Sequence, residues 1–144
     1  MKISQMLQTD RPMLSCEIFP PKTTADFDTV WNAATEIAKS EPAFISVTFG
    51  AGGGRSKNTV ELAHAVERQL GVTALAHLTC VSSTRETVHA KIIEMQEAGI
   101  ENVMALRGDI PENMDLSHQE NWHYHHAIDL IRELKESGAD FCIG

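Results

Sequence analysis

One local pattern recurs along this chain: an amphipathic stretch, a single glycine, and then a short apolar stretch. The three glycines are Gly71, Gly99 and Gly138. A glycine in the left-handed conformation is the usual residue just after the end of a helix. Helices that pass directly into strands, repeated along a chain, predict a parallel sheet with right-handed crossovers. The pattern therefore predicts the α/β class.

Hydrophobic periodicity places the expected elements. Strands are expected at 13–19, 44–49, 73–78, 102–106 and 140–143. Helices are expected at 25–40, 57–70 and 124–137, with a short amphipathic segment at 3–8. A further helix should open at the capping sequence 83–86 and bury Val88, Ile92 and Met95.

The length is that of one ordinary domain, spanning residues 1–144. A net charge of −8 argues against nucleic acid or an anionic membrane as a partner. No apolar stretch approaches the ~18 residues of a membrane span, and no signal-peptide core is expected at the start. Cys16, Cys80 and Cys142 are odd in number and form no CxxC motif. We expect reduced, buried thiols in a cytoplasmic protein.

Near the C-terminal end of each expected strand, polar residues occupy alternate positions, which point to the same face of a sheet. This alternation is called here their parity. These polar residues are Ser15, Glu17, Ser46, Thr48, His77, Thr79, Arg107 and Asp109. A (β/α)₈ barrel places its active site at these ends, and a doubly wound sheet places its ligand there too. The parity therefore predicts a site and leaves the choice of fold open.

Glu17 is the most informative of these residues. It lies in an apolar run that ends at Pro20 and Pro21. A carboxyl group in such surroundings is costly to bury unless it is paired or protonated. A carboxyl that holds its proton near neutral pH is what general acid catalysis requires. The alternative is a solvated glutamate on an edge strand.

The other motifs are weaker when taken singly. The glycine-rich turn at 48–56 lacks both P-loop and GxGxxG spacing, so a tight connection is the simpler interpretation. Arg107-Gly108-Asp109 puts a cation and a carboxylate at the rim of the sheet, although a surface ion pair would give the same pattern. His77 is either a ligand or a hydrogen-bonded core histidine. No metal is expected at 122–126, because adjacent histidines point to different faces of a helix.

Four segments together resemble methylenetetrahydrofolate reductase. They are 17–23, 45–51, 76–80 and 106–111, in the right order and each at an expected strand end. The resemblance spans nearly the whole chain. It implies a (β/α)₈ barrel with FAD at its C-terminal mouth, of which about the first 4.5 βα units are present, since a full barrel needs ~250 residues. It also implies reduction of 5,10-methylenetetrahydrofolate to 5-methyltetrahydrofolate with NAD(P)H.

The resemblance also assigns roles to residues. Glu17 is similar to the general acid that protonates the folate as its five-membered ring opens. Asp109 matches the carboxylate beside flavin and substrate. Thr48, His77, Arg107, Gly108 and, less closely, Ala127 match flavin contacts. Because later strands of the family supply further contacts, we expect little or no turnover by this chain alone.

Two other functions fit the same residues. One is a non-catalytic flavin-binding or assembly half-barrel, completed by a partner or by a second copy. The other is an unrelated phosphate-binding α/β domain. An open half-barrel would leave strand edges and an apolar inner face exposed, which favours pairing with another chain.

Overall fold

The computed structural model describes residues 1–21, 26–49, 56–81, 83–110 and 122–144. Its strands form one parallel sheet in the order β1-β2-β3-β4-β5. The strands are β1 (Ser15–Ile18), β2 (Phe44–Val47), β3 (Thr73–Thr79), β4 (Asn102–Leu106) and β5 (Cys142–Ile143). The helices are α1 (Ile3–Met6), α2 (Phe27–Ala38), α3 (Ser56–Ala65), η2 (Val66–Leu70), α4 (Arg85–Glu97) and α5 (Ala127–Glu136). The predicted parallel α/β class is confirmed.

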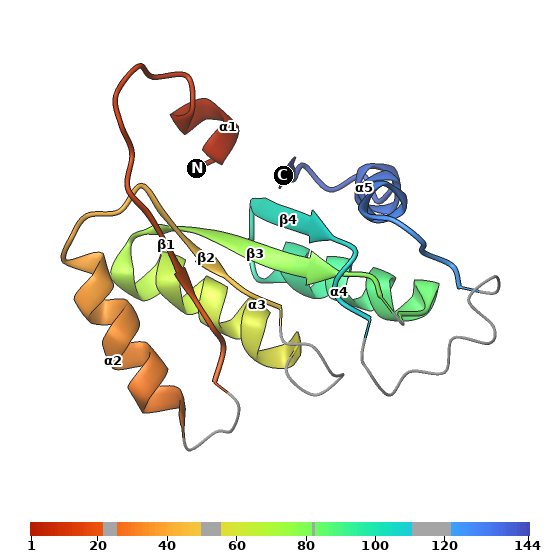
Figure 1. Ribbon diagram of the computed structural model, residues 1–144, viewed down its shortest axis with the longest axis horizontal. Coiled ribbons are helices and arrows are strands. Elements are labelled where there is room, and N and C mark those ends of the chain that lie inside the picture. The colour runs from red at the N-terminus through yellow and green to blue at the C-terminus, as the bar shows by residue number, and fades with distance from the viewer. Residues whose placement is uncertain (22–25, 50–55, 82, 111–121) are drawn as a thin grey trace.

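The two faces of the sheet differ sharply in burial. Helices α2, α3 and α4 lie along one face (Figure 1). The strand residues on this face are apolar and at most 7% exposed, apart from the partly buried Cys16 and Ile143. They include Ile18, Ile45, Val47, Ala74, Ala76, Leu78, Val103 and Ala105. The hydrophobic core therefore lies between this face and the helices.

Residues of the other parity form the second face, called here the inner face. The register pairs Glu17 with Ser46 and Ser46 with Leu75, so these three side chains share it. His77 pairs with Met104 on the same face. Most inner-face side chains are partly or fully exposed, in contrast to the helix-covered face. The prediction that Glu17, Ser46 and His77 share one face of the sheet is therefore confirmed.

The residues that cap the helices are largely those predicted from the sequence. Gly71, Gly99 and Gly138 have φ of 68°, 73° and 76°, which confirms the left-handed cap predicted for each. The helix predicted to open at the capping sequence 83–86 does so: Thr84 is its cap, with Oγ1 accepting from Thr87 N at 3.2 Å, and α4 begins at Arg85. Val88, Ile92 and Met95 are buried as expected.

Two predicted helices differ from the observed ones. The helix expected at 57–70 begins at Ser56 and ends in the π-helical turn η2. The helix expected from residue 124 begins only at Ala127. There, Asp129 Oδ2 accepts hydrogen bonds from the backbone amides of His125 and His126 at 3.0 and 2.9 Å. This contact from the third residue of the helix back to the amide of the N-cap residue, His126, is part of a capping box and fixes the start of α5.

Helix α1 is attached to the N-terminal ends of the strands. Asn102 is fully buried, and its Oδ1 accepts from Ile3 N at 2.8 Å. Its Nδ2 donates to Met1 O at 3.0 Å and to Ala74 O at 3.2 Å. One side chain therefore joins α1, β3 and β4 at the edge of the sheet opposite the predicted site.

Candidate active site

Glu17 lies on the inner face of β1, and its neighbours come from the next two strands. Ser46 Oγ on β2 lies 3.3 Å from Glu17 Oε2. His77 Nε2 on β3 lies 3.7 Å from the same oxygen. The parallel register sets Ser46 opposite Glu17 and Leu75, and His77 lies two residues beyond Leu75 on the same face of β3. A carboxylate, a hydroxyl and an imidazole therefore converge on one point.

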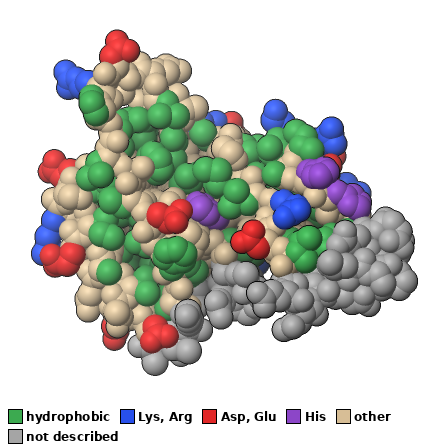
Figure 2. All heavy atoms as spheres, viewed as in Figure 1, with side chains coloured by type: hydrophobic (Ala, Val, Ile, Leu, Met, Phe, Trp, Pro, Cys, Tyr) green, Lys and Arg blue, Asp and Glu red, His purple; other side chains and the backbone are tan. Residues whose placement is uncertain are grey.

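Glu17 lies on β1, at the edge of the described sheet, and its side chain is 48% exposed. Of the two interpretations of this carboxyl, the solvated glutamate on an edge strand describes the structure and the buried carboxyl does not. The reason is that the helices cover the opposite face, and the inner face above β1 lies open. Figure 2 shows acidic and histidine side chains among hydrophobic ones near the middle of this view.

His77 is much less exposed than its partner. Its side chain is 12% exposed. Burial lowers the pKa of His77 below its ordinary value of 6.5, and the nearby Glu17 carboxylate opposes this shift without reversing it. His77 is therefore a neutral imidazole at pH 7, able both to donate and to accept a hydrogen bond.

Thr48 follows β2 directly. Its backbone amide donates to Ile18 O at 3.1 Å, and its carbonyl accepts from Thr59 Oγ1 at 3.0 Å. The backbone amide and carbonyl of Thr48 are both fixed in this way. Its partly buried side chain lies just beyond the strand, at a position that corresponds to the inner face. The glycine-rich turn that follows falls at residues 50–55, outside the described residues.

Arg107, Gly108 and Asp109 follow β4 at the same edge of the sheet. Arg107 and Asp109 are exposed, and Arg107 Nε donates to Gly108 O at 3.1 Å. Arg107 O accepts from Val81 N at 2.7 Å, so the loops after β3 and β4 are tied together. Gly108 has φ of 87°, and a Cβ there would lie 2.8 Å from Val81 Cγ1 and 3.0 Å from Thr79 Cβ. Glycine is therefore required by close packing between these two loops.

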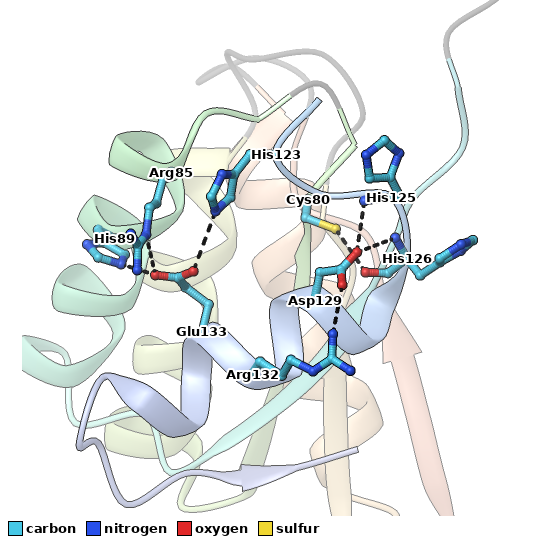
Figure 3. A network of polar contacts seen from close by, with 9 residues as sticks. All are labelled: Cys80, Arg85, His89, His123, His125, His126, Asp129, Arg132 and Glu133. Atoms are coloured by element: carbon cyan, nitrogen blue, oxygen red, sulfur yellow. Dashed lines mark hydrogen bonds and ion pairs between the residues drawn. The ribbon is translucent and has the colours of Figure 1, made fainter. Parts of the chain in front are cut away.

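Ala127 is the first residue of α5. The residue before it, His126, lies next to the loops that follow β3 and β4 (Figure 3). The Sγ of Cys80, just after β3, lies 3.9 Å from both Arg107 O and His126 O. Cys80 is 1% exposed, whereas Cys16 and Cys142 are only partly buried, so the prediction of three buried thiols is correct for Cys80 alone. All three are free.

Ser46 is among the polar strand-end residues predicted from the sequence, but no role was predicted for it. Its direct contact with Glu17 makes it a site residue. The signal that could have found it is the parallel register, which sets Ser46 opposite Glu17 once the two strands are aligned. The structure thus brings together Glu17, Ser46 and His77, and puts the Arg107–Asp109 loop at the same edge.

Within the described ranges, no three His, Cys, Asp or Glu side chains stand close enough to hold a metal ion. No helix in those ranges is long and apolar enough to cross a membrane.

The fold and site together define a parallel α/β protein whose candidate site lies at the C-terminal edge of its sheet, where such sheets bind ligands. Residues 2–144 match the family model described as methylenetetrahydrofolate reductase, and the chain belongs to this family. The resemblance stated from its motifs is thereby confirmed.

Three relatives illustrate the similarity. Methylenetetrahydrofolate reductase 2 of Schizosaccharomyces pombe is 36% identical over 132 residues, which are 90% of this chain and 21% of the relative. The 5,10-methylenetetrahydrofolate reductase of Pectobacterium carotovorum is 34% identical over 130 residues, covering 90% of this chain and 41% of the relative. A probable methylenetetrahydrofolate reductase (NADH) of Oryza sativa is 31% identical over 140 residues, covering 97% and 24%. The chain thus spans less than half the length of each.

Proposed function

We propose that this chain forms the first βα units of an FAD-dependent methylenetetrahydrofolate reductase barrel and contributes its proton donor. The reaction is reduction of 5,10-methylenetetrahydrofolate to 5-methyltetrahydrofolate with NAD(P)H, in the cytoplasm. The observation that carries this proposal is the convergence of Glu17, Ser46 and His77 on the inner face. Polar groups at this position are what a (β/α)₈ barrel uses for chemistry.

The residues at the strand ends fit FAD by their chemistry. Arg107 presents an exposed guanidinium, the group best suited to a diphosphate. His77, neutral at pH 7, and Thr48 offer uncharged hydrogen-bonding groups, which suit the polar edge of a flavin ring. Gly108 and Ala127 add small residues at the same edge. When bound, FAD supplies the two-electron chemistry that passes hydride from the nicotinamide to the folate.

Glu17 is the proton donor in this proposal. Its carboxyl group gives a proton to the folate nitrogen that leaves the methylene carbon when the five-membered ring opens. A ligand that covers the inner face removes the carboxyl from water, and desolvation favours the neutral, proton-carrying form of such a group. Ser46 holds one oxygen of Glu17 and thereby orients the other. Asp109 contributes a second carboxylate beside flavin and substrate.

A direct test is FAD binding by the purified chain, followed through the fluorescence of the flavin. We expect Arg107→Gln and His77→Gln to weaken FAD binding. Lys39→Gln is the matched control, because it removes one positive charge from the exposed end of α2, where Lys39 pairs only with Glu36 among the described residues. Equal weakening by Arg107→Gln and Lys39→Gln would contradict the proposed flavin site.

The isolated chain should show little or no turnover. The relatives it matches are more than twice as long, and in the proposed barrel the later strands complete the flavin, folate and nicotinamide sites. The assay is oxidation of NADH with menadione or methylenetetrahydrofolate as acceptor. Measurable turnover by the 144-residue chain would overturn this expectation.

A second candidate function is a non-catalytic flavin-binding or assembly half-barrel completed by a partner or a second copy. The open inner face favours it, together with Phe19 and Leu14 next to β1, which are 70% and 52% exposed. Molecular mass in solution and the absorbance of the purified protein separate the candidates. A dimer that carries flavin supports self-completion, and a colourless monomer argues against it.

A further inference from the structure

A buried hydroxyl group lies beside the C-terminal end of β2. It belongs to Thr59 on α3, one of the helices that cover the sheet face opposite the inner face (Figure 1). The side chain of Thr59 is fully buried, and its helical neighbours Val60, Leu62 and Ala63 are apolar and at most 2% exposed. A buried hydroxyl is costly unless it forms a hydrogen bond, and valine has nearly the same shape without that cost. The hydroxyl at this position therefore needs a specific partner.

Thr59 makes a hydrogen bond outside its own helix. Its Oγ1 donates to Thr48 O, which is 3.0 Å away and 11 residues earlier in the chain. The pairing of β2 with its neighbours ends at Val47, so the Thr48 carbonyl lies just beyond the strand. Threonine hydroxyls in helices often bond the carbonyl one turn earlier in the same helix, as Thr35 Oγ1 does to Trp31 O at 2.9 Å. Thr59 reaches a different element, the first peptide after β2.

The backbone of Thr48 is also tied to the strand that carries Glu17. Its amide donates to Ile18 O at 3.1 Å, and Ile18 directly follows Glu17. Two residues before Thr48, Ser46 Oγ lies 3.3 Å from the Glu17 carboxylate. The Thr48 side chain lies at an inner-face position, whereas Thr59 lies on the face that the helices cover. The Thr59 hydroxyl therefore holds the strand end that carries site residues without belonging to the inner face itself.

The sequence after this strand end gives it little conformational preference. Residues 50–54 read Gly-Ala-Gly-Gly-Gly. Glycine allows the backbone more conformations than any other residue, so such a stretch does not by itself fix the residue that precedes it. The position of Thr48 therefore depends on the two hydrogen bonds of its own backbone, one to β1 and one to the Thr59 hydroxyl.

We propose that Thr59 is a positioning residue of the candidate site: its hydroxyl fixes the Thr48 peptide and thereby holds the Thr48 side chain where it binds flavin. Thr59 itself contacts neither flavin nor folate. Without the hydroxyl, the Thr48 carbonyl loses the partner it has in the structure and the strand end gains conformational freedom. Ligand binding must then order this backbone first, which weakens the affinity.

This inference rests on the proposed flavin-binding function, but the fixing of the Thr48 peptide can be measured without any ligand. The test therefore uses three measurements on the whole 144-residue chain. Flavin fluorescence gives the affinity for FAD. Urea unfolding gives the stability. Amide hydrogen exchange in the absence of FAD reports on peptides that cover residues 46–49.

Thr59→Val removes the hydroxyl and nearly keeps the shape, whereas Thr59→Ser keeps the hydroxyl. We expect Thr59→Val to weaken FAD binding by up to about tenfold, the range of one hydrogen bond. Peptides covering 46–49 should exchange several-fold faster in this variant. Thr59→Ser should restore both properties. Thr35→Val is the matched control, because it removes the same kind of hydrogen bond from α2, where the acceptor lies in the same helix.

Thr35→Val should lower the stability but leave FAD affinity and exchange at 46–49 unchanged, which separates positioning from a general loss of stability. Unchanged exchange at 46–49 in Thr59→Val overturns the claim that the hydroxyl fixes the Thr48 peptide. Faster exchange with unchanged FAD affinity overturns the positioning role, as does equal weakening of FAD binding by Thr59→Val and Thr35→Val. Absence of FAD binding by the parent chain is instead the failure of the proposed function, and exchange at 46–49 then decides whether Thr59 holds the strand end.

Discussion

Glu17 Oε2 and His77 Nε2 lie 3.7 Å apart although their strands, β1 and β3, are separated by β2. Ser46 on the intervening strand β2 reaches the same carboxylate oxygen, at 3.3 Å. A half-exposed carboxylate is thus held beside a mostly buried, neutral imidazole. Burial lowers the pKa of the imidazole, so His77 is able both to donate and to accept a hydrogen bond beside this carboxylate.

The pH behaviour of His77 gives the first prediction. Burial lowers the pKa of His77 in the folded protein. Below pH 6.5 the unfolded chain therefore binds more protons than the folded protein does, and the free energy of unfolding decreases as the pH falls. The stability therefore rises with pH between the lowered pKa and 6.5. Glu17→Gln should lower the pKa of His77 further, since the Glu17 carboxylate opposes the effect of burial. The measurement is an NMR titration of the His77 ring, and an unchanged or higher midpoint in the variant would count against this account.

The packing of Gly108 gives a prediction about stability. Gly108→Ala combines a positive φ with a Cβ 2.8 Å from Val81 Cγ1, whereas Gly138→Ala has a positive φ and open space around the Cβ. We expect Gly138→Ala to cost about 1–2 kcal/mol of unfolding free energy. Gly108→Ala should cost a further ~1–3 kcal/mol because of the overpacking. Urea unfolding of both variants measures the difference, and equal losses would show that the loops relax freely.

Asn102 should be a strong point of attachment for α1. Asn102→Ala leaves Ile3 N and Ala74 O without the partners they have in the structure, and we expect a loss of ~1–3 kcal/mol. The exposed Glu101, which pairs with the amino group of Met1, is the control, and Glu101→Ala should cost at most ~1 kcal/mol. Amide exchange at residues 1–7 should increase in the Asn102 variant. Similar losses for the two variants would mean that the buried amide has no special role.

Cys80 should be the least reactive thiol. Burial, assisted by the charge of Asp129, raises the pKa of Cys80 to about 11, and only the thiolate reacts with alkylating reagents. At about pH 8, iodoacetamide should therefore modify the partly buried Cys16 and Cys142 well before Cys80. Mass spectrometry of timed samples, with denatured protein as the reference for full reactivity, gives the order. Early modification of Cys80 would contradict its buried position.

Much of the fold follows from local sequence signals. The glycines at 71, 99 and 138 end helices as their conformational preference requires. The strand Asn102–Leu106 has the predicted bounds, because apolar residues are flanked there by turn-forming and charged residues. The alternation of polar and apolar residues correctly assigned Glu17, Ser46 and His77 to one face.

Other features depend on contacts between distant residues and have no local signal. The exposure of Glu17 depends on what covers the inner face, which its own strand does not encode. Glu133 on α5 is buried with Arg85 and His89 of α4 as hydrogen-bond partners, 48 and 44 positions away, and nothing near Glu133 in the sequence distinguishes it from a surface glutamate. Asn102 likewise resembles a turn residue at the start of a strand, and only the position of α1 explains its burial.

In the proposed reaction, Glu17 donates the proton needed for folate reduction and has no part in flavin reduction. The most direct measurement is Glu17→Gln at the matching position of a full-length relative, with the two half-reactions followed separately by stopped-flow absorbance of the flavin. We predict that flavin reduction by NAD(P)H survives while reoxidation by methylenetetrahydrofolate falls by a factor of about 10²–10⁴, the usual contribution of a general acid. Persistence of both half-reactions at the parent rates would contradict the account.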